Sequence, residues 1–329
     1  MYIFINYLRV LAAILITNSH YGQVWPVASL AAGGLIGNIL FFAISGFCLY
    51  HIKENFVKYY SKRIVRIYPL VILFTLFTVL IGDYAINGFN DLIRLFIYPT
   101  NYIFIVWLMI AYVLFYIVAY LSKKYDKFLE TTFLALIVVW ILVYFVFVEK
   151  NYYHVDSVYE PFIFFLYFIS MLMGALFRKH KEKIKKGNIK RDFIFLFISL
   201  VLYFGSKIAF SKIIKIAPLQ ILNQFAILLV LYFIFKTAFI LEERLKKFPN
   251  KLNKTISFVS NLTLHIYVVQ FIVIRRLQHF VFPINLLVVS VGIFVLATVV
   301  YYIENLIRKI IVDLIRKHKK GDGNAKSID

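Results

Sequence analysis

The chain has 329 residues, of which 62% are hydrophobic and 19% are aromatic, and its mean hydropathy is +0.82. A soluble domain of this length would expose far more charge, so this composition excludes an ordinary soluble protein and indicates a polytopic membrane protein. The net charge of +21 does not indicate nucleic-acid binding, because the basic residues lie in short clusters between apolar runs.

Ten apolar runs of about membrane-spanning length predict an all-α bundle of about ten transmembrane helices. In chain order, the predicted helices are residues 2–21, 29–50, 67–82, 101–121, 130–148, 160–177, 192–210, 217–241, 256–275 and 284–307. We expect one membrane domain over residues 1–316. Residues 317–329 are polar and basic, and we expect them to form a disordered cytoplasmic tail.

The distribution of basic residues predicts the orientation of the helices. If both termini are cytoplasmic, the cytoplasmic loops and tail hold 28 of the 37 Lys and Arg residues, and the outer loops hold seven. Cytoplasmic loops of membrane proteins carry an excess of Lys and Arg. The sequence therefore predicts a multi-pass protein of the cell membrane with an even number of helices and contacts to membrane lipids.

The first predicted helix contains two ionisable residues, Arg9 and His20. Ionisable residues inside membrane helices are costly and commonly functional. Their spacing of eleven residues is close to three full turns, so both side chains lie on one face, roughly 16 Å apart along the axis. We expect this pair to serve an extended, anionic substrate.

A second group of candidates follows at Ser45 and at the basic cluster Lys62, Arg63 and Arg66. Ser45 and its glycine neighbour permit close helix packing. The basic cluster either contacts the membrane surface and sets topology or binds phosphate, for which the arginine fork is well suited. The only cysteine, Cys48, excludes an intrachain disulfide, and we expect it to be a small buried residue.

Three further polar features have a structural and a functional interpretation. Asn18 either orients His20 or binds an acceptor hydroxyl, or it packs locally. Glu304 either orients a functional arginine or pairs with Arg308 one turn later. Asn223 and Gln224 are expected to join helices. No residues have the spacing of a metal site, so we expect no bound metal or cofactor.

These residues resemble acyltransferase family 3, the integral-membrane acyltransferases that mostly O-acetylate cell-surface glycans. The motifs that carry the resemblance are Arg9 with His20, the run Phe41 to Phe47, Arg63 with Arg66, Ile67 and Pro69, Trp107 to Tyr116, Ser257 to Gln270, and Tyr301 to Glu304. Two positions depart from the family pattern. Gln270 stands where the family often has a histidine, so we assign no acid–base role to Gln270. Leu306 replaces a proline that often follows the final glutamate, here Glu304.

The resemblance implies acetyl-CoA as the donor and a glycan or its lipid-linked precursor as the acceptor. For such a transfer, His20 is our candidate general base, because a neutral imidazole suits proton removal near neutral pH. An acyl-histidine intermediate is a second mechanism. Arg9 would orient the donor or stabilise developing charge, and the cluster from Lys62 to Arg66 would hold the donor phosphates.

Two other functions remain as alternatives. The first is a transporter or flippase of a lipid-linked saccharide, although the sequence shows no internal repeat of the kind common in transporters. The second is a membrane partner that passes acyl groups to a separate transferase. The sequence indicates no particular oligomeric state.

Overall fold

The computed structural model describes residues 2–97, 99, 102–185 and 187–325, with side chains up to residue 310. Within these ranges the chain is mostly helical and contains no strand, which confirms the all-α prediction. Ten long helices occupy the ten predicted positions: α1 (Ile3–Ser19), α2 (Gly34–Leu49), α3 (Phe56–Leu80), α5 (Ile103–Lys124), α6 (Phe128–Phe147), α7 (Ile163–Lys179), α9 (Ile189–Lys212), α10 (Ile221–Ile240), α12 (Asn250–Leu277) and α13 (Ile284–Ala325).

Eight helical spans are long and apolar enough to cross a membrane, and one of them is Ala28–Leu49, which includes α2. Helices α1 and α7 have 17 residues each. Short helical segments connect the long helices: η1 (Ala28–Leu30), α4 (Phe89–Leu92), η2 (Ile93–Ile97), α8 (Lys181–Lys185), η4 (Ile214–Leu219) and α11 (Glu242–Lys246). Helix α13 continues past residue 317, where we expected the tail to begin. The division at residue 316 stays a prediction, and residues 326–329 lie outside the described part.

Helix α3 begins much earlier than predicted, at Phe56 instead of residue 67. The Asn55 side chain caps it by accepting a hydrogen bond from the Lys58 amide at 3.0 Å. Basic residues in the first turns look like a loop in a hydropathy pattern, which explains the wrong boundary. Pro69 consequently lies inside the helix instead of in its first turn, and the basic cluster is helical.

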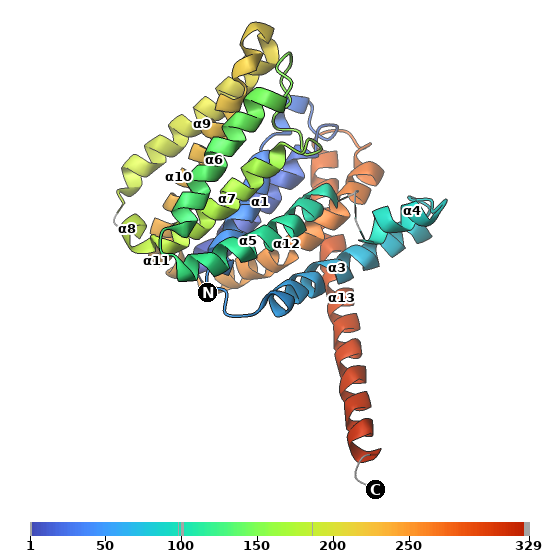
Figure 1. The fold of residues 1–329 in the computed structure, drawn as a ribbon. Coiled ribbons are helices and arrows are strands. Elements are labelled where there is room, and N and C mark those ends of the chain that lie inside the picture. Colours follow the sequence, from blue (N-terminus) through green and yellow to red (C-terminus); the bar gives the residue numbers. More distant parts are fainter. Residues whose placement is uncertain (1, 98, 100–101, 186, 326–329) are drawn as a thin grey trace.

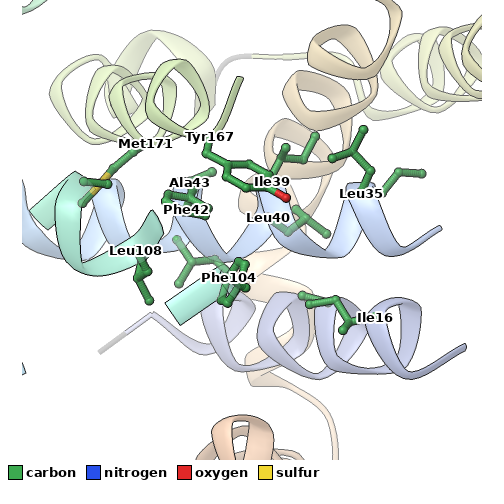
Figure 2. Packing of buried hydrophobic residues seen from close by; sticks show 14 of the residues in the cluster. Ile16, Leu35, Ile39, Leu40, Phe42, Ala43, Phe104, Leu108, Tyr167 and Met171 are labelled. Atoms are coloured by element: carbon green, nitrogen blue, oxygen red, sulfur yellow. The ribbon is translucent and has the colours of Figure 1, made fainter. Parts of the chain in front are cut away.

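Helix α2 forms the centre of the bundle and packs between α1 and α7 (Figure 2). A Cβ atom added to Gly46 would lie 1.8 Å from the Met171 carbonyl oxygen, and one added to Gly174 would lie 1.9 Å from that of Ala43. Glycine at both positions therefore allows the two backbones to touch. This contact confirms the close packing expected at Gly46, whereas Ser45 lies near Tyr112 of α5.

Figure 1 shows the start of α1 and the end of α13 on the same side of the bundle, as an even number of spans requires. The connections from α1 to α2 and from α6 to α7 lie on the opposite side. Helices α6, α9 and α13 lie at the periphery and expose most of their apolar side chains. In a membrane these faces contact lipid.

Candidate active site

A cavity of about 290 Å³ lies between α1, α2, α3, α5 and α12, and we call it the basic cavity. It brings together Arg9 and the predicted phosphate-binding cluster. Its wall consists of Arg9, Phe41, Ile44, Ser45, Cys48, Leu49, Lys62, Arg63, Arg66, Ile67, Phe104, Leu108, Tyr112, Thr263, Leu264 and Tyr267. Five predicted site residues from three separate helices thus face one space.

Aromatic and polar contacts hold the basic side chains at the wall. The Arg63 guanidinium carbon lies 4.3 Å from the Tyr59 ring centroid, and Nη1 donates to the Tyr59 carbonyl at 3.1 Å. Lys62 bonds to Glu54 in the loop before α3, and this hydrogen bond lowers the pKa of the Glu54 carboxyl. The lysine is therefore partly neutralised, whereas the arginines are not.

None of Arg9, Arg63 and Arg66 forms an ion pair with any residue that the structure describes. Arg66 and Arg9 line the same cavity, where their two positive charges repel each other. Charges without partners at membrane depth are costly. An anionic group in the basic cavity would remove this cost.

Cys48 is exposed and lines the basic cavity beside Arg9, so the prediction that it is buried was wrong. The reason is its position on α2. Phe41, Ile44, Ser45 and Cys48 follow at spacings of three, four and seven residues and share one helix face, which forms the cavity wall. The sequence contained this periodicity, but it did not show that the face borders a cavity.

A second cavity, of about 470 Å³, surrounds the C-terminal end of α1, and we call it the histidine cavity. His20 is the residue after α1 instead of a residue within it, and its ring packs edge-on against Phe271 with centroids 4.7 Å apart. The imidazole is exposed. Other polar side chains in the wall are Ser19, Asn38, Tyr84, Asp156, Tyr159, Tyr203, Lys207, Tyr267 and Arg275. This arrangement suits a ligand rich in hydroxyl groups.

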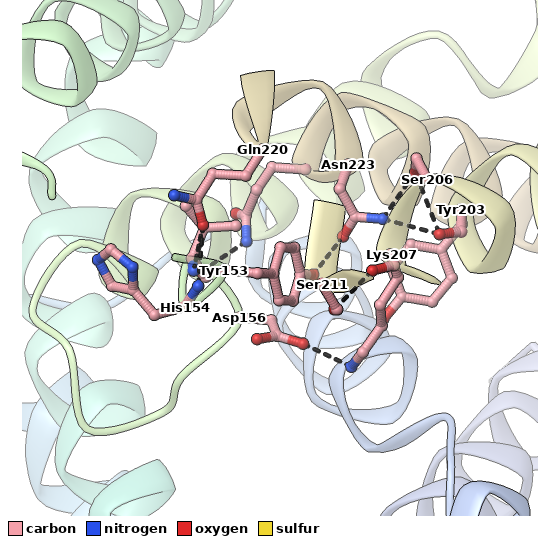
Figure 3. Close-up of polar contacts among 11 residues, drawn as sticks. Tyr153, His154, Asp156, Tyr203, Ser206, Lys207, Ser211, Gln220 and Asn223 are labelled. Carbon is pink, nitrogen blue, oxygen red and sulfur yellow. Dashed lines mark hydrogen bonds and ion pairs between the residues drawn. The ribbon is translucent and has the colours of Figure 1, made fainter. Parts of the chain in front are cut away.

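The connection between α6 and α7 is anchored to α9 and α10, and it places Asp156 in the histidine cavity (Figure 3). The Gln220 side chain accepts hydrogen bonds from two backbone amides of this connection, at 2.8 and 3.2 Å. Tyr153 donates to Asn223 Oδ1 at 2.8 Å. Asp156 then pairs with Lys207 at 2.5 Å. Asn223 also donates to the Tyr203 carbonyl at 2.7 Å, so it joins α10 to α9 as predicted.

Asn18 does not line either cavity. Its Nδ2 donates to the carbonyls of Leu30 and Ala32 at 2.8 and 3.0 Å, and its Oδ1 accepts from Trp25 Nε1 at 2.9 Å. These bonds occupy the amide group. The geometry favours the packing role of Asn18 over the role of orienting His20 or binding an acceptor, because the residue fastens the loop that walls the histidine cavity.

Residues 2–304 match the acyltransferase domain family, acyltransferase family 3. The chain belongs to this family. The match includes both cavities and all the predicted site residues. Comparison with curated proteins and with solved structures finds no match. The protein is accordingly a multi-pass membrane acyltransferase.

The two cavities of the acyltransferase end at the same two rings, because Phe104 and Tyr267 belong to both walls. Arg9 lines the basic cavity and His20 lines the histidine cavity, so the two predicted site residues lie in cavities that meet at these rings. Sequence reasoning assigned Phe104 no role and quoted Tyr267 only as part of a family motif. The sequence neighbours of Phe104 and Tyr267 give no indication that the two rings lie together in the fold.

Glu304 of the acyltransferase lies outside both cavities. It accepts from Arg308 at 2.6 Å and lies 2.8 Å from His265 Nε2. It makes no ion pair with Arg9, Arg63 or Arg66, so the geometry favours the Arg308 pairing that was one of the two expectations. The His265 contact was not foreseen.

Lys207 and Asp156 of the histidine cavity were also missed as candidates. Lys207 lies on α9, within the helix predicted over residues 192–210, but its charge was not singled out. Within the described ranges, no three His, Cys, Asp or Glu side chains are close enough together to hold a metal ion.

Proposed function

We propose that this acyltransferase moves an acetyl group from acetyl-CoA to a hydroxyl of a cell-surface glycan or of its lipid-linked precursor. The observation that carries the proposal is the convergence of three arginines without acidic partners on the basic cavity. Coenzyme A carries phosphate groups, and arginine binds phosphate through paired hydrogen bonds.

In the proposed complex, Arg63 and Arg66 bind phosphates and the acyl-bearing arm points toward the histidine cavity. Lys62 contributes positive charge at the mouth of the basic cavity. The acceptor occupies the histidine cavity, where tyrosines and the Asp156–Lys207 pair offer hydrogen bonds to sugar hydroxyls. In the predicted orientation in the plasma membrane, the donor enters from the cytoplasmic side and the acceptor from the outer side.

The chemical step is a transfer between a thioester and an alcohol. His20 takes the proton from the acceptor hydroxyl while the oxygen attacks the thioester carbonyl. The carbon–sulfur bond then breaks, coenzyme A leaves as a thiolate, and the thiolate takes up a proton from the imidazolium. Arg9 orients the donor and stabilises negative charge on the carbonyl oxygen.

A series of donors that differ in phosphate content tests the donor site. The purified protein in detergent is given acetyl-CoA, 3′-dephospho-acetyl-CoA or acetyl-pantetheine, and KM is measured for each. Each charged hydrogen bond that is lost weakens binding by roughly 1.5–3 kcal/mol, so KM should rise at least about tenfold between the first and last donors. Equal KM values for all three would contradict phosphate recognition.

A further inference from the structure

Two aromatic rings separate the basic cavity from the histidine cavity. Phe104 of α5 and Tyr267 of α12 line both spaces, with ring centroids 5.5 Å apart. Both side chains are largely buried, at 6% and 9% exposure. Arg9 thus lines the cavity on one side of an aromatic wall, and His20 lines the cavity on the other side.

The surrounding helices hold this wall in place. Phe104 packs edge-on against Phe42 at 5.4 Å, and Phe42 stacks on Tyr167 at 4.6 Å (Figure 2). The Tyr167 hydroxyl accepts a hydrogen bond from Asn38 at 3.0 Å. The Phe104 ring also packs edge-on against the Tyr167 ring, with centroids 6.3 Å apart. A ring fixed by contacts to a central helix has little freedom to move aside.

Tyr267 connects the wall to the candidate base. Its ring packs edge-on against Phe271 at 6.0 Å, and Phe271 in turn contacts the His20 ring. A group that reaches from Arg9 to His20 therefore passes Phe104 and Tyr267. No other residue lines both cavities within the described part of the chain.

We propose that Phe104 and Tyr267 form a partition that closes the path between the two cavities to water-soluble molecules and limits the size of the acyl group that crosses it. The second part rests on the proposed function, because it requires that a donor held at Arg63 and Arg66 presents its acyl group to His20. Because the two rings have little freedom to move aside, a short acyl chain crosses between them more readily than a long one, and the acyltransferase is accordingly specific for acetyl over longer acyl groups.

The only cysteine provides a direct test of the partition, since Cys48 lines the basic cavity alone. The full-length protein in sealed vesicles of known orientation is treated with an anionic, membrane-impermeant methanethiosulfonate. Wild type should be labelled only from the side of the basic cavity. Phe104→Ala and, as a second variant, Tyr267→Ala should be labelled from both sides, with a rate from the histidine side that increases about tenfold or more.

Leu108→Ala is the matched control. Leu108 lies one turn after Phe104 on α5 and lines the basic cavity alone, so this variant should keep one-sided labelling. Equal labelling of wild type from both sides would overturn the partition. Failure of both ring variants to change one-sided labelling, with size-exclusion profiles like wild type, would also overturn it.

The acyl-length part is tested with acetyl-, butyryl- and hexanoyl-CoA. The ratio of kcat/KM for hexanoyl-CoA to that for acetyl-CoA should rise about tenfold or more in Phe104→Ala and stay near wild type in Leu108→Ala. An unchanged ratio in both ring variants would overturn this part. If wild type transfers no acyl group from any donor, the proposed function fails, whereas the labelling result still decides whether the partition exists.

Discussion

Arg66 has the most exposed position of the three arginines in the basic cavity, and it has no acidic partner among the described residues. Its guanidinium is free to bind phosphate. We predict that Arg66→Ala raises the KM for acetyl-CoA about tenfold or more, which corresponds to one lost charged hydrogen bond of roughly 1.5–3 kcal/mol. Lys58→Ala serves as the control, because Lys58 lies on the same helix but outside the cavity. Equal KM values for the two variants would exclude Arg66 from donor binding.

The contacts of Glu304 indicate that it stabilises the fold and does not bind substrate. The carboxylate is buried and bonded to His265 and Arg308. Arg308 is 45% exposed, so its pair with Glu304 is only partly buried. Loss of hydrogen bonds at the buried carboxylate costs roughly 1–3 kcal/mol, so Glu304→Gln should lower Tm while leaving the KM for acetyl-CoA unchanged. Glu243→Gln, at an exposed carboxylate, should leave Tm unchanged. A raised KM without a change in Tm would instead support the functional role of Glu304.

At the residue scale, the sequence identified Arg9, His20 and the basic cluster because an ionisable group in an apolar run is visible without knowing the fold. Cys48, Phe104 and Tyr267 were not identified as wall residues. Each is an ordinary member of an apolar helix, and only the packing of α2, α5 and α12 makes them a cavity wall. The role of Asn18 also depended on a loop contact that no spacing rule predicts.

At the scale of single helices, the contact between α2 and α7 depends on two glycines. Gly46→Ala would place a methyl group against the Met171 carbonyl and force the helices apart. We predict a loss of about 1–3 kcal/mol in unfolding free energy or failure to fold, read as a lower Tm in detergent. Gly205→Ala is the control, since a Cβ there meets nothing within 4 Å and alanine favours the helix. A Gly46→Ala variant as stable as Gly205→Ala would contradict the close packing.

The ten helices were predictable from hydropathy because membrane-spanning length imposes a strong pattern. The boundaries of these helices were harder to predict from hydropathy. Helix α3 begins at Phe56 because Asn55 caps it, and α1 begins where Glu242 of α11 accepts hydrogen bonds from the Ile3 and Phe4 amides at 3.1 and 2.8 Å. The Asn55 cap is a local signal in the sequence, but the basic residues that follow it made the start of α3 look like a loop. The second joins distant parts of the chain and has no local signal.

For the whole molecule, the structure places the start of α1 and the end of α13 on one side, and the basic loops predict that this side is cytoplasmic (Figure 1). Reporter fusions that are active only outside the cytoplasm should therefore be inactive at either terminus and active in the connection between α6 and α7. Activity at the termini would reverse the orientation of both cavities.

The account depends most directly on His20 as the general base. The decisive measurement is the rate at which the purified protein forms base-labile, radiolabelled acetyl esters on envelope glycan from labelled acetyl-CoA, for wild type and for His20→Gln. We predict that His20→Gln lowers the rate about 100-fold or more while its Kd for acetyl-CoA stays at the wild-type value, because His20 lies outside the basic cavity. A His20→Gln rate equal to that of wild type, at equal amounts of folded protein, would contradict this mechanism.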